Sequence, residues 1–201
     1  YGIFYEFIPM SQFNGVNSDT ISLEDVELGV NYAVVISTNA GLWRYLIGDT
    51  VQFTSIQPFR LKVSGRTKHF INAFGEEIII DNAERALKKA CEATGAVVHE
   101  YTAAPVYMSG ESSGAHEWLI EFEREPDSLS NFKTFLDKGL KEVNSDYEAK
   151  RHKNMALHEP IIHQASPELF YNWLKHKGKL GGQHKVPRLS NNRSYMDELL
   201  E

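Results

Sequence analysis

Two stretches of the chain decide its fold: YLIGD at residues 45–49 and SGRTKHFINAFGEEI at residues 64–78. The first lies within a run of strand and turn signals and ends in a glycine followed by a carboxylate. The second lies where these signals give way to alternating helix and strand patterns. We therefore expect two units that meet near residues 60–68, with almost no flexible linker between them.

The residues before this boundary are predicted to be rich in β structure. Residues 2–9 are aromatic and β-branched, and residues 31–38 (NYAVVIST) are apolar enough for a strand buried on both faces. Further strands are expected at residues 42–47 and 51–56, on either side of a tight turn at Gly48-Asp49. Gly48 would supply a backbone angle there that a Cβ resists. This order predicts a meander or part of a small barrel.

The residues after the boundary are predicted to alternate in the order β-α-β-β-α-β-α, which is close to a split βαβ sandwich. Asp81 is the expected N-cap of the first helix and Gly95 its end. Two more helices are expected, at residues 130–143 and from Ser166-Pro167 to Gly178. The expected strands are residues 97–108, 117–123 and 161–165. The predicted fold class is therefore α+β, with a mixed sheet in the second unit.

The composition excludes several kinds of protein. The chain has 201 residues, of which 42% are hydrophobic, and its 21 basic and 27 acidic residues give a formal charge of −6. We therefore expect no nucleic-acid partner, and no apolar run reaches the roughly 18–20 residues of a membrane span. The single cysteine, Cys91, falls on an apolar helix face and is expected to act as a small buried hydrophobe. One unpaired cysteine fits a cytoplasmic location.

Common catalytic and phosphate-binding motifs are absent from the sequence. It contains no G-x-x-x-x-G-K-[ST] loop, no G-x-G-x-x-G, no H-E-x-x-H and no G-x-S-x-G. His152, His158 and His163 have no cysteine beside them in sequence, so no metal site is expected among these residues.

What remains is the chemistry of the two deciding stretches. An exposed Asp49 directly after Gly48 can accept two hydroxyl hydrogen bonds, which suits a ribose diol. Its alternative role is to satisfy the backbone of its own turn. Arg66 and Lys68, taken alone, are a solvated basic turn. The two patterns together are more specific than either one.

Together they resemble the adenylate-forming superfamily, through Tyr-x-x-Gly-Asp at Tyr45–Asp49 and Gly-Arg-x-Lys-x-x-Ile-x-x-x-Gly-Glu-x-Ile from Gly65, followed by Glu84. Three further stretches, YEFIP at residues 5–9, GLWRY at 41–45 and QHKVPR at 183–188, resemble the Gretchen Hagen (auxin-responsive promoter) family of acyl-acid amido synthetases, in a bacterial-type version. The resemblance implies an ATP-dependent ligase that adenylates a small carboxylic acid and conjugates it to an amino acid.

The resemblance also implies roles for individual residues. Asp49 would hold the ribose hydroxyls of ATP, and Arg66 would contact the nucleotide or close over it. Lys68 would be the hinge about which a small C-terminal lid domain rotates. Lys185 would be the catalytic lysine, which neutralises charge on the α-phosphate in the transition state. Tyr45 would line the adenylate pocket, although aromatic strand residues also form cores.

The implied domains are an incomplete, β-rich remnant of the large domain at residues 1–65 and a smaller α/β lid at residues 66–201. The phosphate loop, a Tyr-x-x-Ser-Glu-like motif and the acyl pocket of the family have no counterpart here. Since the chain begins at Tyr1 rather than at Met, we expect it to be the C-terminal piece of a longer enzyme. Such a piece would be inactive alone, and Mg²⁺ would be bound mainly by the missing part.

Two alternatives remain open at this point. The acceptor of the acyl group could be the thiol of coenzyme A rather than an amine. The chain could instead be a non-catalytic binding module, since sheet-based RNA binders share the split βαβ order. The sequence specifies neither the acyl acid, nor the amino acid, nor the oligomeric state.

Overall fold

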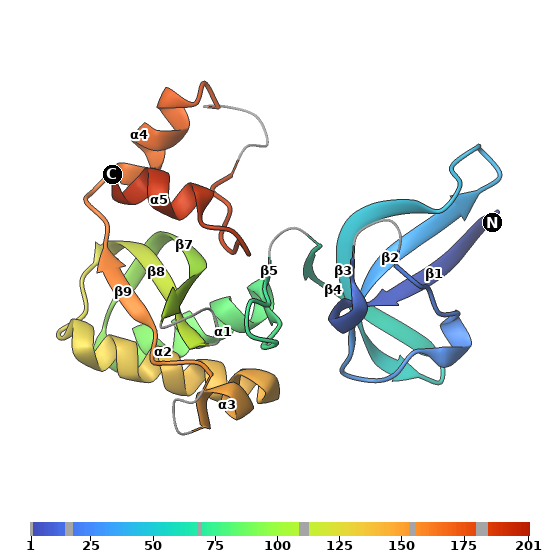
Figure 1. Cartoon of the computed structure of the whole chain (residues 1–201), viewed down its shortest axis with the longest axis horizontal. Coiled ribbons are helices and arrows are strands. Elements are labelled where there is room, and N and C mark those ends of the chain that lie inside the picture. Colours follow the sequence, from blue (N-terminus) through green and yellow to red (C-terminus); the bar gives the residue numbers. More distant parts are fainter. Residues whose placement is uncertain (1, 15–17, 68–69, 109–112, 153–155, 180–184) are drawn as a thin grey trace. The chain divides into compact units, whose positions relative to one another are not determined.

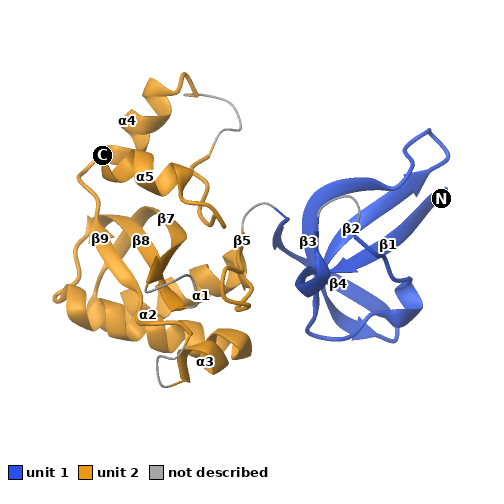
Figure 2. Cartoon of the chain, in the orientation of Figure 1, with its two compact units in different colours: residues 1–68 blue, residues 69–201 orange. Residues whose placement is uncertain are grey.

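The computed structural model describes residues 2–14, 18–67, 70–108, 113–152, 156–179 and 185–201. The chain divides into two compact units, Tyr1–Lys68 and His69–Glu201 (Figure 2). Each unit has its own hydrophobic core, and each is described by itself below.

Unit 1 is built on a four-stranded antiparallel meander (Figure 1), which agrees with the predicted meander but not with all of its predicted strands. Each strand pairs with the next along the chain, in the order β1-β2-β3-β4. Two short 3₁₀ turns, η1 (Met10–Gln12) and η3 (Leu23–Asp25), lie between the first two strands. The strands are β1 (Ile3–Pro9), β2 (Asn31–Thr38), β3 (Tyr45–Ile56) and β4 (Phe59–Arg66).

The predicted tight turn at Gly48-Asp49 is wrong, because β3 runs through both residues without reversing. The register with β2 shifts there instead: Ala33 pairs with Thr50, whereas Val35 pairs with Leu46. Gly48 has a φ of +91°, which confirms the predicted unusual backbone angle. The extra residues form a bulge, and the chain turns back only after Ile56, into β4, which was not predicted.

The core of unit 1 is aromatic. Phe7 packs edge-on against Phe53, with ring centroids 5.2 Å apart, and against Tyr32, at 6.1 Å. Four successive residues of β2, Tyr32–Val35, are buried, which confirms that the middle of this strand is covered on both faces.

Unit 2 is an α+β domain, as predicted. Its main sheet has the order β7-β8-β9 and is mixed, because β8 is antiparallel to β7 and parallel to β9. A separate antiparallel pair is formed by β5 and β6, which are two residues long each. In chain order the elements are β5 (Phe70–Ile71), β6 (Ile78–Ile79), α1 (Ile80–Thr94), β7 (Val97–Met108), β8 (Ser113–Arg124), α2 (Leu129–Val143), α3 (Ser145–Arg151), β9 (Ile161–Gln164), α4 (Leu169–His176) and α5 (Ser194–Leu200).

Helices cover both faces of this sheet (Figure 1). Trp118 and Ile120 belong to a buried cluster with the apolar residues of α1 and α2. Leu119, on the opposite face of β8, belongs to a second cluster with residues of α4 and α5. A Cβ on Gly139 of α2 would lie 2.9 Å from Cα of Ala86 in α1, so these two helices are in close contact.

The ends of α1 follow the sequence only in part. Gly95 closes the helix with a φ of +67°, as predicted. Asp81 is not the N-cap, because the helix already begins at Ile80. The side-chain oxygen of Asn82 instead accepts a hydrogen bond of 3.2 Å from the N–H of Ile79.

Cys91 on this helix is half-buried, and burial raises the pKa of its thiol. No helix in the described ranges is long and apolar enough to cross a membrane.

A buried ion pair joins α2 to α3. The carboxylate of Asp137 accepts hydrogen bonds from Nε and Nη2 of Arg151, at 2.7 and 3.0 Å, and from the hydroxyl of Tyr147, at 2.8 Å. Lys141 contacts the same carboxylate at 2.6 Å. Burial alone would raise the pKa of Asp137, but the hydrogen bonds from Arg151, Lys141 and Tyr147 outweigh it and lower the pKa.

Replacing Asp137 by Asn tests this pair. Because the charge of Arg151 would remain buried without its anion, we expect Asp137→Asn to lower the free energy of unfolding at pH 7 by about 3 kcal/mol. The folded-state pKa of Asp137 is depressed, so its contribution is complete above its unfolded pKa and is lost as the pH falls through the folded value. The difference in the free energy of unfolding between wild type and variant, measured by urea unfolding, should therefore become smaller below about pH 4.

The matched control is Asp127→Asn, at an exposed position just before α2. It should change the free energy of unfolding by no more than about 0.5 kcal/mol. A gap for Asp137→Asn that widens as the pH falls would contradict the assignment.

Candidate functional site

A register shift between β3 and β4, at Thr50 and Val51, places Asp49 beside Arg66. Asp49 pairs with Arg66 in the register of β3 and β4, although 17 positions separate them in sequence. Nε of Arg66 lies 3.4 Å from Oδ1 of Asp49. The contact between the two strands extends one residue further, because the N–H of Thr67 donates to the carbonyl of Gly48 at 2.9 Å. Asp49 thus lies within a strand. The expectation that it lies in a turn at the end of a strand is wrong.

Both charged groups are accessible to a ligand. The side chains of Arg66 and Asp49 are 68% and 43% exposed, and an ion pair this exposed contributes little to folding. In the part of the chain that the structure describes, no backbone N–H donates to the carboxylate of Asp49, which argues against the alternative that it satisfies its own turn. The pair can therefore accept hydroxyl hydrogen bonds through Asp49 and contact an anion through Arg66.

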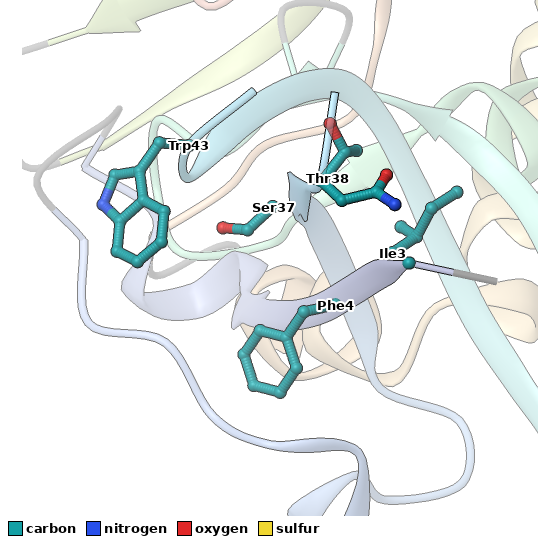
Figure 3. Close-up of a pocket in the computed structure, with 7 residues that line it drawn as sticks. Ile3, Phe4, Ser37, Thr38 and Trp43 are labelled. Atoms are coloured by element: carbon teal, nitrogen blue, oxygen red, sulfur yellow. The ribbon is translucent and has the colours of Figure 1, made fainter. Parts of the chain in front are cut away.

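The aromatic residues before the bulge are exposed and do not belong to the core. Tyr45, at the start of β3, is 51% exposed, and Trp43 is 83% exposed. Trp43 lies over an open hollow of about 330 Å³ that is lined also by Ile3, Phe4 and the hydroxyl groups of Ser37 and Thr38 (Figure 3). Tyr45, Asp49 and Arg66 do not line this hollow, so it is a separate feature of unit 1.

The two lysines of the expected site lie in different situations. Lys68 lies outside the described residues. Lys185 is exposed and is followed by Val186, which is only 4% exposed and packs in the cluster between the sheet, α4 and α5. The structure therefore brings Asp49 and Arg66 together in unit 1 and presents Lys185 on the surface of unit 2.

The Gly-Glu pair of the second motif is structural. Glu76 is fully buried and lies 2.7 Å from Nε2 of His116, and its other oxygen accepts the N–H of Phe74 at 2.7 Å. The next residue, Glu77, has a φ of +38°. Burial, with the negative charge of Asp146, raises the pKa of Glu77 to about 7. These contacts fix the loop between β5 and β6.

Arg188, which follows the lysine in sequence and was given no role from the sequence, links the lysine segment to α1 and β7. Arg188 forms an ion pair with Glu84 of α1 and another, at 3.2 Å, with Glu100 of β7. The motif that ends at Glu84 and the one that contains Lys185 therefore meet in unit 2. The nearest signal in the sequence was that Glu84 and Arg188 each belong to a motif of the resemblance, whereas Glu100 belongs to none.

No group of three or more His, Cys, Asp or Glu side chains that could hold a metal ion occurs among the described residues.

Comparison with known proteins identifies the family. The GH3 family central domain matches residues 1–66, and the GH3 family C-terminal domain matches residues 81–194. The chain therefore belongs to the GH3 family, which is the Gretchen Hagen family that the motifs resemble.

Its relatives are longer plant proteins. It is 24% identical over 201 residues to the 4-substituted benzoates-glutamate ligase GH3.12 of Arabidopsis thaliana, covering 92% of the chain and 35% of the relative. It is 29% identical over 204 residues to the jasmonoyl-L-amino acid synthetase JAR6 of Nicotiana attenuata, covering 92% and 33%. The chain thus spans about a third of the length of the curated relatives it matches.

A solved structure shows the same fold. The GH3.15 acyl acid amido synthetase superposes with a TM-score of 0.69 at 20% identity, over 98% of this chain and 36% of the other. At that identity the likeness establishes the architecture, which agrees with the predicted α+β class.

The bulge can be tested at Gly48. Because its φ of +91° disfavours any residue with a Cβ, Gly48→Ala should lower the free energy of unfolding of unit 1 by about 1–2 kcal/mol. The nearest atom to a new Cβ, Oγ1 of Thr67, is 4.0 Å away, so backbone strain and not crowding is the cause. Gly48→Asn should cost less, since Asn tolerates positive φ better than Ala. An equal loss in both variants, measured by denaturant unfolding, would refute the strain explanation.

Proposed function

We propose that the chain is the C-terminal part of an ATP-dependent acyl-acid amido synthetase, which adenylates a small carboxylic acid and then joins it to the amine of an amino acid. The observation that carries the proposal is the exposed Asp49–Arg66 pair, which a register shift between β3 and β4 brings together from two motifs. Family membership supports it, and so do the printed names of the relatives, which are ligases of acids with amino acids. These names favour an amine over a thiol as the acceptor.

Asp49 would bind the ribose of ATP. Its carboxylate can accept hydrogen bonds from two neighbouring hydroxyls, and the guanidinium of Arg66, 3.4 Å away, helps to orient it. Arg66 would also offer positive charge to the nucleotide phosphates, and Tyr45 would present its exposed ring beside them. Activation of a carboxylate by ATP depends mainly on positioning and charge stabilisation, which such groups supply.

Lys185 would act in the first half-reaction only. An ammonium on the smaller domain can stabilise charge on the α-phosphate during adenylation and be withdrawn during transfer.

Lys68 would be the hinge between the two arrangements, and the boundary between residues 1–65 and 66–201 would be the domain boundary. Mg²⁺ and the phosphates would be held mainly by the remainder of the enzyme. We also propose a cytoplasmic location, on the unpaired Cys91.

The ribose contact is tested by Asp49→Asn in the full-length enzyme. Loss of charge-assisted hydrogen bonds to the ribose should raise the KM for ATP in ATP–pyrophosphate exchange by about tenfold or more. The control, Asp19→Asn at another exposed position of unit 1, should leave the KM for ATP within about twofold of the wild-type value. An unchanged KM in Asp49→Asn would rule out the ribose contact.

The lysine is tested by Lys185→Ala. Adenylation should fall by about a hundredfold or more, whereas amide formation from a supplied acyl-adenylate should be spared. The control is Lys175→Ala, which removes an exposed lysine from α4 of the same unit. Equal loss of both half-reactions would contradict the division of labour.

A further inference from the structure

The segment that follows Lys185 is fastened to the edge of β7. The N–H of Ala103 donates to the carbonyl of Arg188 at 2.9 Å, and the N–H of Ser190 donates to the carbonyl of Ala103 at 3.1 Å. The hydroxyl of Thr102 donates to the carbonyl of Pro187 at 2.7 Å. Leu189 is fully buried in the core. Residues 186–190 therefore have a fixed position on the sheet.

Arg188 fixes the direction in which this segment leaves the sheet. Its Nη1 pairs with Glu84 of α1, its Nε lies 3.2 Å from Oε1 of Glu100, and its guanidinium carbon lies 5.3 Å from the ring centroid of Tyr101. The same oxygen of Glu100 accepts the N–H of Tyr101 at 3.1 Å. One side chain thus connects the helix, the strand and the lysine segment.

The two residues between Arg188 and Lys185 transmit this direction. Pro187 has a fixed φ, and the residue before a proline is restricted to extended conformations, so Val186 and Pro187 form a stiff connection. Val186 is also held by burial. Movement of Arg188 would therefore displace the backbone of Lys185 instead of being absorbed between them.

Folding stability accounts for little of the ion pair between Arg188 and Glu84. The side chains of Arg188 and Glu84 are 39% and 48% exposed, and pairs of this exposure contribute little to the free energy of folding. The segment is also held by three other hydrogen bonds and by the buried apolar side chains of Val186 and Leu189.

We infer that Arg188 is a positioning residue for Lys185: by bridging Glu84 and Glu100, it aims the lysine at the phosphate that is attacked during adenylation. This inference rests on the proposed function. The ammonium of Lys185 would need accurate placement, because a displacement of about 1 Å at a catalytic group can lower the rate about a hundredfold.

The test compares Arg188→Met with Arg85→Met in the full-length enzyme. Both remove an arginine from a carboxylate pair, but Arg85 pairs with Asp81 on the exposed face of α1. Arg188→Met should lower kcat for ATP–pyrophosphate exchange by about tenfold to a hundredfold, with the KM for ATP and the transfer half-reaction within about twofold of wild type. Arg85→Met should leave all three within about twofold.

Combination with Lys185→Ala separates positioning from a general structural effect. If Arg188 acts through Lys185, Arg188→Met causes no further loss in the Lys185→Ala background. Arg188→Lys should restore only part of the rate, since one ammonium does not span both carboxylates as a guanidinium does. Glu84→Gln and Glu100→Gln should each lower adenylation by about threefold or more, which provides the same test should Arg188→Met fail to fold.

The outcomes distinguish the two levels of the proposal. Adenylation that is slow in Lys185→Ala but normal in the Arg188 and glutamate variants overturns the positioning role alone. An equal fold-loss from Arg188→Met with and without Lys185 also overturns it. Normal adenylation in Lys185→Ala overturns the role of the lysine itself, and the positioning role with it.

Discussion

The register between β3 and β4 determines where Asp49 and Arg66 lie in unit 1. This register shifts between Thr50 and Val51, and the shift sets Asp49 opposite Arg66, while Gly48, with a φ of +91°, lets the same stretch of β3 bulge against β2. Without the shift, the register in which Val51 pairs with Val63 would place Asp49 opposite Gly65, and the two charges would not be paired. The site therefore depends on backbone geometry in the middle of a strand, not on a loop.

In unit 2, the residue of interest is Lys185, which we propose as catalytic and which is exposed at the surface of this domain. Helices on both faces bury the β7–β8–β9 sheet, and this leaves its edge to receive the segment of residues 186–190. The buried pairs Asp137–Arg151 and Glu76–His116 fix α3 and the β5–β6 loop. In the proposed function, a well-supported lysine would move only when its domain moves as a whole.

Much of the fold could be predicted because its signals are local. The strands at residues 31–38 and 97–108 and the helix α2 follow directly from runs or periodicity of apolar residues. The helices α3 and α5 were missed because they are short and their buried residues, such as Tyr147 and Met196, pack on distant partners. β4 was missed although its residues alternate between apolar and polar from Phe59 to Ser64, and its apolar side chains Leu61 and Val63 are exposed and form no core face. The turn at Gly48 was wrong because a glycine signal does not distinguish a turn from a bulge until the neighbouring strand is known. For the site, motif resemblance singled out Asp49 and Arg66 but not their pairing, and nothing local indicated that Arg188 meets Glu84.

The most direct test of the account is whether Asp49 recognises ribose hydroxyls. The measurement is kcat/KM for ATP and for 2′,3′-dideoxy-ATP in the full-length enzyme, with Asp49 intact or replaced by Ala. The account predicts that the wild type prefers ATP by about a hundredfold or more and that Asp49→Ala nearly abolishes the preference. The same preference in both proteins would show that the ribose is recognised elsewhere and would contradict the central claim.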